Sequence, residues 1–308
     1  MKIHPVFSSF IGIDWSGSKA KSHAGLQLAI SKPGSGAPQR VSPPLNRHWS
    51  RTEVYDYLIE RADNAAGKEP VLAGIDFAFA HPFDDKESYF PGAPNSPKTP
   101  AALWALVESV NNDQPNLYGG AMFSHDLWGQ YYLAPPSYQA RHYASRRRHT
   151  ELAARAAGRS PSPTFKAVGA DNVSTGSLAG MRLLHQLKQR LGPRLAIWPF
   201  ENIIYGETNL VLVEIFPSFY FYHLGMVPAK KAAADPSFLN KALSAYNSEG
   251  VSPDFVPMGN DADEADALIS TAVLRYYSRA SGLNLPDQLY SIARSEGWIF
   301  GVPNMIVK

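Results

Sequence analysis

Aspartates stand at positions where a sheet or a helix would present them to a common site. Asp14 and Asp76 each end a continuous apolar run, and Asp263 and Asp266 open a segment with helical periodicity. Because they are three residues apart, Asp263 and Asp266 project from one face of that helix. A carboxylate at the end of a buried strand is costly to desolvate unless it is paired or binds a metal. The pattern indicates a divalent-metal site if these acids converge.

A fifth acid, Glu214, lies within an apolar run. Burying a glutamate there costs free energy unless a cation or hydrogen bonds compensate its charge. Each acid alone also has a structural explanation. Acids in a first helical turn complement the helix dipole, and an aspartate after a strand is a common turn former. Two such strands together with an acidic helix start favour the metal site, with Glu214 as a further candidate.

Composition narrows the classes of function. With 29 basic and 27 acidic residues the net charge is +2, so a nucleic-acid surface has to be a local patch. The absence of cysteine excludes thiolate metal sites and cysteine nucleophiles, which leaves hard-cation or histidine sites. No apolar stretch reaches the roughly 18 residues of a membrane-spanning helix. We therefore expect a folded cytoplasmic protein without a membrane partner.

The order of elements predicts an α/β core that is interrupted once. We expect a hairpin over 10–15 and 23–30, a short third strand near 40–42, a helix over 49–64, central strands over 71–76 and 211–216, and a helix over 260–279. Between 81 and 209 the alternation stops and proline-rich loops and helical segments follow. The predicted domains are a core of 1–80 and 210–308 and a mostly helical insertion of 81–209.

The predicted insertion contains a basic segment over 141–159, which has six arginines and a single acidic residue, Glu151. These are Arg141, Arg146, Arg147, Arg148, Arg155 and Arg159. Such a segment, with Lys19 from the turn after the first strand, would suit a phosphate backbone. A solvated helix face is an equally good explanation.

Two smaller signals lie beside the predicted site. Residues 174–177, Ser-Thr-Gly-Ser, precede an expected helix over 178–191, and capping explains them more simply than a bound phosphate. His81 follows the strand that carries Asp76, and a structural role for it is the commoner outcome.

This order of elements resembles the RNase H-like superfamily. Within it, the chain resembles an uncharacterised family described as predicted RNase H-like nucleases, through residues 12–14, 74–76, 214–217, 263–268 and 297–299. The resemblance implies a mixed five-stranded sheet flanked by helices.

Holliday-junction resolvases of the same superfamily have a similar Asp-x-x-Asp-Ala-Leu helix, which matches Asp263 and Asp266. Their first-strand acid matches Asp14. Their second acid, usually a glutamate, matches Asp76, which is shorter by one methylene.

The resemblance implies hydrolysis of nucleic-acid phosphodiester bonds, in DNA or RNA, with two Mg²⁺ or Mn²⁺ ions. Asp14 would bridge the ions, and Asp76 and Asp266 would each hold one. Asp263 or Glu214 would complete or orient the ligand shell. Aspartate oxygens are the ligands that these hard cations prefer.

Two alternatives remain open. The turn over 14–19 also resembles the phosphate-binding hairpin of sugar kinases and other actin-like ATPases, which would make the protein an ATP-dependent phosphotransferase. No glycine-rich loop follows Asp76, and this weakens that alternative. The second alternative is a non-catalytic nucleic-acid-binding module that uses the basic segment.

Overall fold

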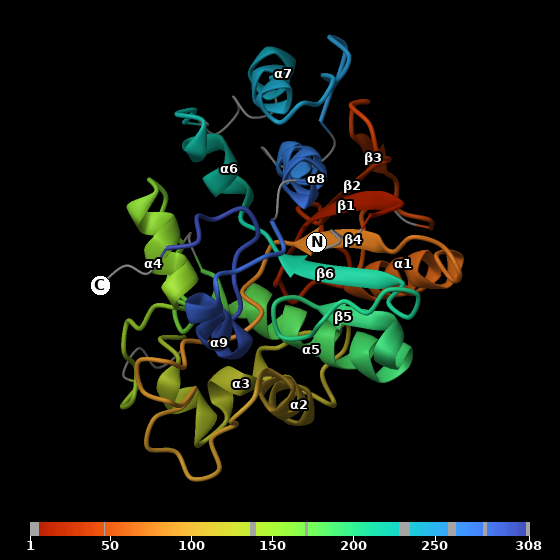
Figure 1. Ribbon diagram of the computed structural model, residues 1–308. Coiled ribbons are helices and arrows are strands. Elements are labelled where there is room, and N and C mark those ends of the chain that lie inside the picture. Colours follow the sequence, from red (N-terminus) through yellow and green to blue (C-terminus); the bar gives the residue numbers. More distant parts are fainter. Residues whose placement is uncertain are drawn as a thin grey trace.

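The strands form one mixed sheet with the order β3-β2-β1-β4-β6-β5 (Figure 1). Their bounds are β1 (Ser9–Asp14), β2 (Gln27–Ser31), β3 (Gln39–Val41), β4 (Val71–Ile75), β5 (Leu195–Ile197) and β6 (Leu210–Glu214). The computed structural model describes residues 6–45, 47–135, 140–169, 172–227, 235–257, 263–279 and 282–305.

Strand direction brings several strand ends to one edge of the sheet. β2 is antiparallel to β1 and β3, whereas β1, β4, β6 and β5 are parallel. The register pairs Ile13 with Ile75 and Ile75 with Glu214. The predicted hairpin, third strand and central parallel strands are therefore confirmed, and Asp14, Asp76 and Glu214 lie at the same edge.

The prediction of five strands was wrong for this sheet. The described residues include a sixth strand, β5, which comes from the stretch 81–209 that we expected to lie outside the core. β5 has only three residues and follows a short 3₁₀ turn, Gly192–Arg194, so it has no alternating pattern long enough to detect.

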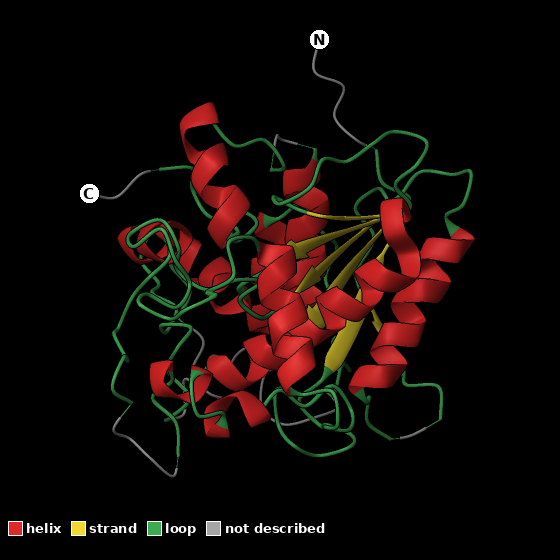
Figure 2. Cartoon of the chain, turned by 90° about the horizontal axis from the view of Figure 1, so that it is seen from below, coloured by secondary structure: helices red, strands yellow, loops and turns green. Residues whose placement is uncertain are grey.

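Helices cover both faces of the sheet. α6 (Pro217–His223), α7 (Pro236–Ala245) and α8 (Asp263–Ser278) lie on one side. On the other side lie α1 (Arg51–Asn64), α2 (Pro100–Val110), α3 (Ala121–Ser124) and α5 (Ser174–Leu191). Figure 2 views the molecule from this side, with helices in front of the strands. α4 (His149–Ala156) and α9 (Asp287–Glu296) pack at the side of the sheet where the strands end.

The predicted helices over 49–64 and 260–279 are present as α1 and α8, and the start of the second prediction, 260–262, lies outside the described residues. Within the described ranges, no helix combines the length and the apolar character needed to cross a bilayer.

Alternate residues of the central strands enter two separate hydrophobic cores. Ile11 and Ile13 of β1 pack with the layer of α1, α2 and α5, while Phe10 packs with the layer of α6 and α8. Residues of α2 and α5 share the first core with the strands, so the stretch 81–209 packs as part of the sheet's own helix layer. Burial on both faces explains why these strands are continuously apolar.

α8 approaches β1 more closely than a side chain would permit. The Gly12 N–H donates to Thr271 Oγ1 at 3.0 Å, and a Cβ built on Gly12 would lie 2.4 Å from the carbonyl oxygen of Ala267. Because Asp14 is two residues beyond Gly12 and Asp266 immediately precedes Ala267, this contact sets the distance between two of the predicted site acids.

Gly12→Ala should therefore lower the free energy of unfolding by about 1–3 kcal/mol, because α8 has to move away from β1. Urea unfolding measures this change. Gly36→Ala is the matched control, since a Cβ there meets nothing within 4 Å and its effect should stay within about 0.5 kcal/mol. Equal unfolding free energies for the two variants would show that the close approach is not required.

Candidate active site

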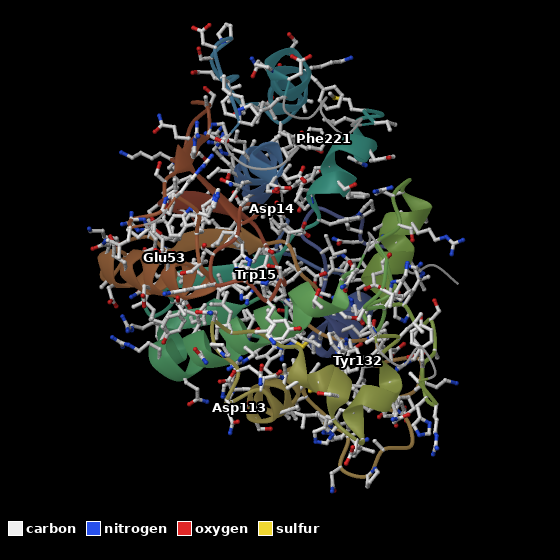
Figure 3. All side chains as sticks on the ribbon, turned by 180° about the vertical axis from the view of Figure 1, so that it is seen from behind. Asp14, Trp15, Glu53, Asp113, Tyr132 and Phe221 are labelled. Atoms are coloured by element: carbon white, nitrogen blue, oxygen red, sulfur yellow. The ribbon has the colours of Figure 1, made fainter. Side chains whose placement is uncertain are left out.

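Four of the predicted acids come together above the ends of β1 and β4. Asp14 is the last residue of β1 and is 9% exposed, and Asp76 follows β4 directly. Asp263 and Asp266 belong to the first turn of α8, which passes beside Asp14 in Figure 3. Asp76 and Asp266 are half-buried, so the cluster is open to solvent on one side.

The four carboxylates affect one another electrostatically. Burial raises the pKa of Asp14 well above its ordinary value, and the charges of Asp266, Asp76 and Asp263 raise it further. Burial also raises the pKa of Asp76, with a second contribution from Asp266. The pKa of Asp266 is raised to about 7 by burial and by the charge of Asp263. The three pKa shifts have the same two causes: each carboxyl group is poorly solvated, and negative charges lie close to it.

The donor set suits a hard divalent cation. All four donors are carboxylates, and a cation would relieve the repulsion that helps to raise the pKa values of Asp14, Asp76 and Asp266. As the side chains stand, no group of three or more Asp, Glu or His residues within the described ranges is arranged to hold an ion.

Glu214 has a different role from the one predicted. Arg148 donates to both of its oxygens, from Nη1 to Oε2 at 2.7 Å and from Nη2 to Oε1 at 2.6 Å. Oε2 also accepts from the Phe79 N–H at 3.0 Å. Arg148 Nε donates to Glu151 Oε1 at 2.8 Å. Both oxygens of Glu214 are thus engaged by a buried arginine, and the prediction that it completes a metal shell is corrected to a structural ion pair.

The basic segment does not form one continuous surface. Arg148 is 1% exposed in its ion pairs, and Arg146 binds Asp85 and three backbone carbonyls, so neither is placed to bind nucleic acid as predicted. Arg147 is half-buried and donates to the Pro161 carbonyl. Arg141 and Arg155 are exposed. The arginines that point inward do so because carboxylates and loop carbonyls accept their hydrogen bonds there.

Lys19, the remaining residue of the predicted nucleic-acid surface, is exposed. Its Nζ lies 5.8 Å from the centre of the Tyr118 ring. It stands in the loop that follows Asp14, close in sequence to the acid cluster.

The loop after Asp14 is fixed by a buried arginine that sequence inspection did not identify. Arg51 is fully buried, and its Nη1 donates to the carbonyls of Ser16 and Ser18 at 2.8 and 2.9 Å. Trp15 Nε1 donates to the Gly176 carbonyl at 3.1 Å. A Cβ on Gly17 would lie 2.2 Å from the Gly176 nitrogen, so the loop packs directly against the start of α5.

Residues 174–177 are the first turn of α5, which therefore begins four residues earlier than expected. Ser174 Oγ donates to the Thr164 carbonyl and Ser177 Oγ to the Val173 carbonyl. These two hydroxyls are used within the fold, which leaves the half-buried Thr175 as the hydroxyl on the open side of the turn.

His81 is a core residue. Its Nδ1 lies 2.9 Å from Thr164 Oγ1 and its Nε2 lies 2.8 Å from the Tyr132 hydroxyl. The ring stacks on Phe165 at 4.2 Å, and burial holds its pKa well below the ordinary value. A structural role, the commoner expectation, is the one that these contacts support.

A pocket of about 420 Å³ adjoins the acids. One part of its lining comes from the strand ends and includes Asp76, Glu214 and Phe216, and a second part comes from residues 159–162 and 172–176. The loop after Asp14 and the start of α4 also contribute, through Trp15, Gly17, Arg148 and Glu151. A larger groove of about 1250 Å³, lined by Trp198 and Tyr205 among others, contains none of the predicted site residues. The smaller pocket is therefore the one next to the candidate chemistry.

No protein-family model, curated protein or solved structure matches this chain.

The acid cluster should make the protein less stable as pH rises. Asp266 titrates near its ordinary value of 3.8 when unfolded but at about 7 when folded, so the native state binds more protons between these values. In EDTA, this group alone should lower the unfolding free energy by about 2–3 kcal/mol between pH 5 and pH 8. In Asp266→Asn, the unfolding free energy should fall less between pH 5 and pH 8 than it does in the wild type. Urea unfolding at the two pH values measures this difference.

The exposed Asp113 provides the control, since Asp113→Asn should keep the wild-type pH dependence. Identical pH dependence in Asp266→Asn and the wild type would mean that Asp266 is not held with a raised pKa.

Arg148→Ala should lower the unfolding free energy by about 3–5 kcal/mol, because it leaves Glu214 and Glu151 buried without their cation. Arg155→Ala, an exposed position on the same helix, should change it by less than about 0.5 kcal/mol. Chemical unfolding measures both. If both variants changed the unfolding free energy by a similar, small amount, the ion pair between Arg148 and Glu214 would not be what holds the start of α4 to the end of β6.

Proposed function

We propose that the protein is a metal-dependent nuclease that hydrolyses phosphodiester bonds of nucleic acid. The observation that carries the proposal is the convergence of Asp14, Asp76, Asp263 and Asp266 at one edge of the sheet, where neighbouring carboxylates raise the pKa values of Asp14, Asp76 and Asp266. Carboxylates that repel one another in a partly solvated site are the arrangement expected of a cation-binding centre.

The arrangement of elements supports an RNase H-like core as part of this proposal. A hairpin with a third strand, then α1, then the parallel strands β4 and β6, and finally α8 follow in the order that the resemblance implies. β5 adds a sixth strand at the edge beyond β6 and leaves the neighbours of β1 and β4 unchanged.

In this proposal Asp14, Asp76 and Asp266 hold Mg²⁺ or Mn²⁺, and Asp263 completes or orients the ligand set. The bound metal would supply an activated water and stabilise the charge that develops on the phosphate. The raised pKa of Asp266 means that cation binding displaces a proton near neutral pH. Glu214, paired with Arg148, would remain a neighbour of Asp76 outside the set of acids that would hold the metal.

Mg²⁺ or Mn²⁺ should support cleavage of nucleic acid, and Asp14→Asn and Asp266→Asn should each lower the rate at least about 100-fold, because each removes a charged metal ligand. Gel assays on DNA and RNA substrates, together with calorimetric titration of Mn²⁺, measure activity and binding. Asp113→Asn, far from Asp14 in Figure 3, should retain both. Intact substrates together with no heat of metal binding would refute the proposal.

One contact favours the phosphotransferase as a second candidate. Gly17, in the loop that resembles a phosphate-binding hairpin, packs against Gly176 at the start of α5, and both residues line the pocket beside Asp76. Stabilisation by millimolar ATP in a melting assay would favour this function over hydrolysis. The non-catalytic alternative predicts salt-dependent nucleic-acid binding that Asp14→Asn does not change.

A further inference from the structure

The pocket beside Asp76 has two kinds of wall. The strand ends contribute Phe216, whose half-buried ring lines the pocket, and the acidic Asp76. A second part of the lining comes from 159–162 and 172–176, and it includes polar side chains such as Asn172 and Thr175. Arg148, Glu151 and Glu214 also line the pocket, and their charges are paired with one another. An apolar ring together with a few polar groups is the usual lining of a site for a small organic ligand.

Arg159 gives this pocket a cation whose position is fixed. Its Nε donates to Ser218 Oγ at 2.8 Å, and its guanidinium carbon lies 4.6 Å from the centre of the Tyr222 ring. These two contacts engage one nitrogen and one face of the guanidinium, and Arg159 lines the pocket together with Asp76. An arginine held in this way suits a phosphate group.

The pocket's size limits what enters it. At about 420 Å³ it lies near the lower end of the range for ligand pockets, which is roughly 300–1,000 Å³. That space accepts one nucleotide but not a base pair with its two backbones. A base stacks readily on an aromatic ring, and polar side chains recognise its edge once it is unpaired.

We propose that this pocket binds one unpaired nucleotide of the substrate, so that the protein acts on single-stranded or locally unpaired nucleic acid. Phe216 stacks on the base, and Arg159 binds a phosphate of the same strand. Asp76 lines the pocket and also belongs to the acid cluster, so the adjoining phosphodiester lies at the candidate metal centre. The assignment rests on the proposed nuclease function and names its substrate class.

Binding is measured in EDTA, where cleavage is not required, by fluorescence anisotropy of labelled DNA and RNA single strands and of the matched duplexes. Of the DNA and RNA single strands, the one with the higher affinity for the protein should bind about tenfold more tightly than the duplex of the same sequence. Phe216→Leu and Arg159→Gln should each weaken single-strand binding about fivefold or more, and leave duplex binding unchanged.

Arg190→Gln is the matched control, because it removes the same charge at an exposed position near the other end of α5. It should have less than about a twofold effect on single-strand binding. Melting curves check the fold of Phe216→Leu, and Arg159→Gln, at the half-buried Arg159, tests the pocket without removing an aromatic ring. Equal binding of single strands and duplexes, or pocket variants that behave like Arg190→Gln, would overturn the assignment.

Two further outcomes separate this assignment from the nuclease itself. Tight, pocket-dependent binding of single strands without cleavage in Mg²⁺ or Mn²⁺ supports the pocket and refutes the nuclease. Cleavage of duplex and single strand at equal rates supports the nuclease and refutes the pocket. A free mononucleotide that competes as well as an oligonucleotide also refutes it, and favours the phosphotransferase.

Discussion

The site depends on how closely α8 packs against β1. A glycine at position 12 lacks the side chain that would hold the helix away, and its buried backbone N–H donates to Thr271 Oγ1. The consequence extends beyond packing, because the first turn of the same helix carries Asp263 and Asp266 to the end of the strand that carries Asp14. Hydrophobic burial along α8 therefore supplies the free energy that holds like charges together.

The charge balance around the strand ends separates the acids into two groups. Glu214 has a buried arginine bound to both of its oxygens, and Arg148 also binds Glu151. Asp14 and Asp76 have their pKa values raised by burial and by other acids. A carboxylate with a fixed cation is already neutralised, whereas a cluster of carboxylates attracts a mobile one. Asp76 interacts with both groups of acids, because the charge of Glu214 also raises its pKa.

The parts of the fold that were predictable from sequence are those with strong local patterns. Continuous apolar runs identified β4 and β6, and the apolar stripe after Asp263 identified α8. Strand ends at one edge then implied that Asp14 and Asp76 lie close together. The partner of Glu214 was not predictable, because Arg148 is 66 residues away in sequence and its neighbours are arginines of similar appearance. The spacing of Arg148 and Glu151 was a local signal that an inward-facing pair was possible.

The stretch 81–209 has more than one physical role. It supplies an edge strand and helices that complete a hydrophobic core, so removing it would expose the sheet. It also supplies Arg148, which neutralises a strand-end acid, and the wall of residues 159–162 and 172–176 beside Asp76. An α/β sheet offers ligands a crevice at its carboxyl edge, but the loops define its shape. Specificity is thus expected to depend on Arg159 and its neighbours, while the chemistry depends on acids that the sheet and α8 position.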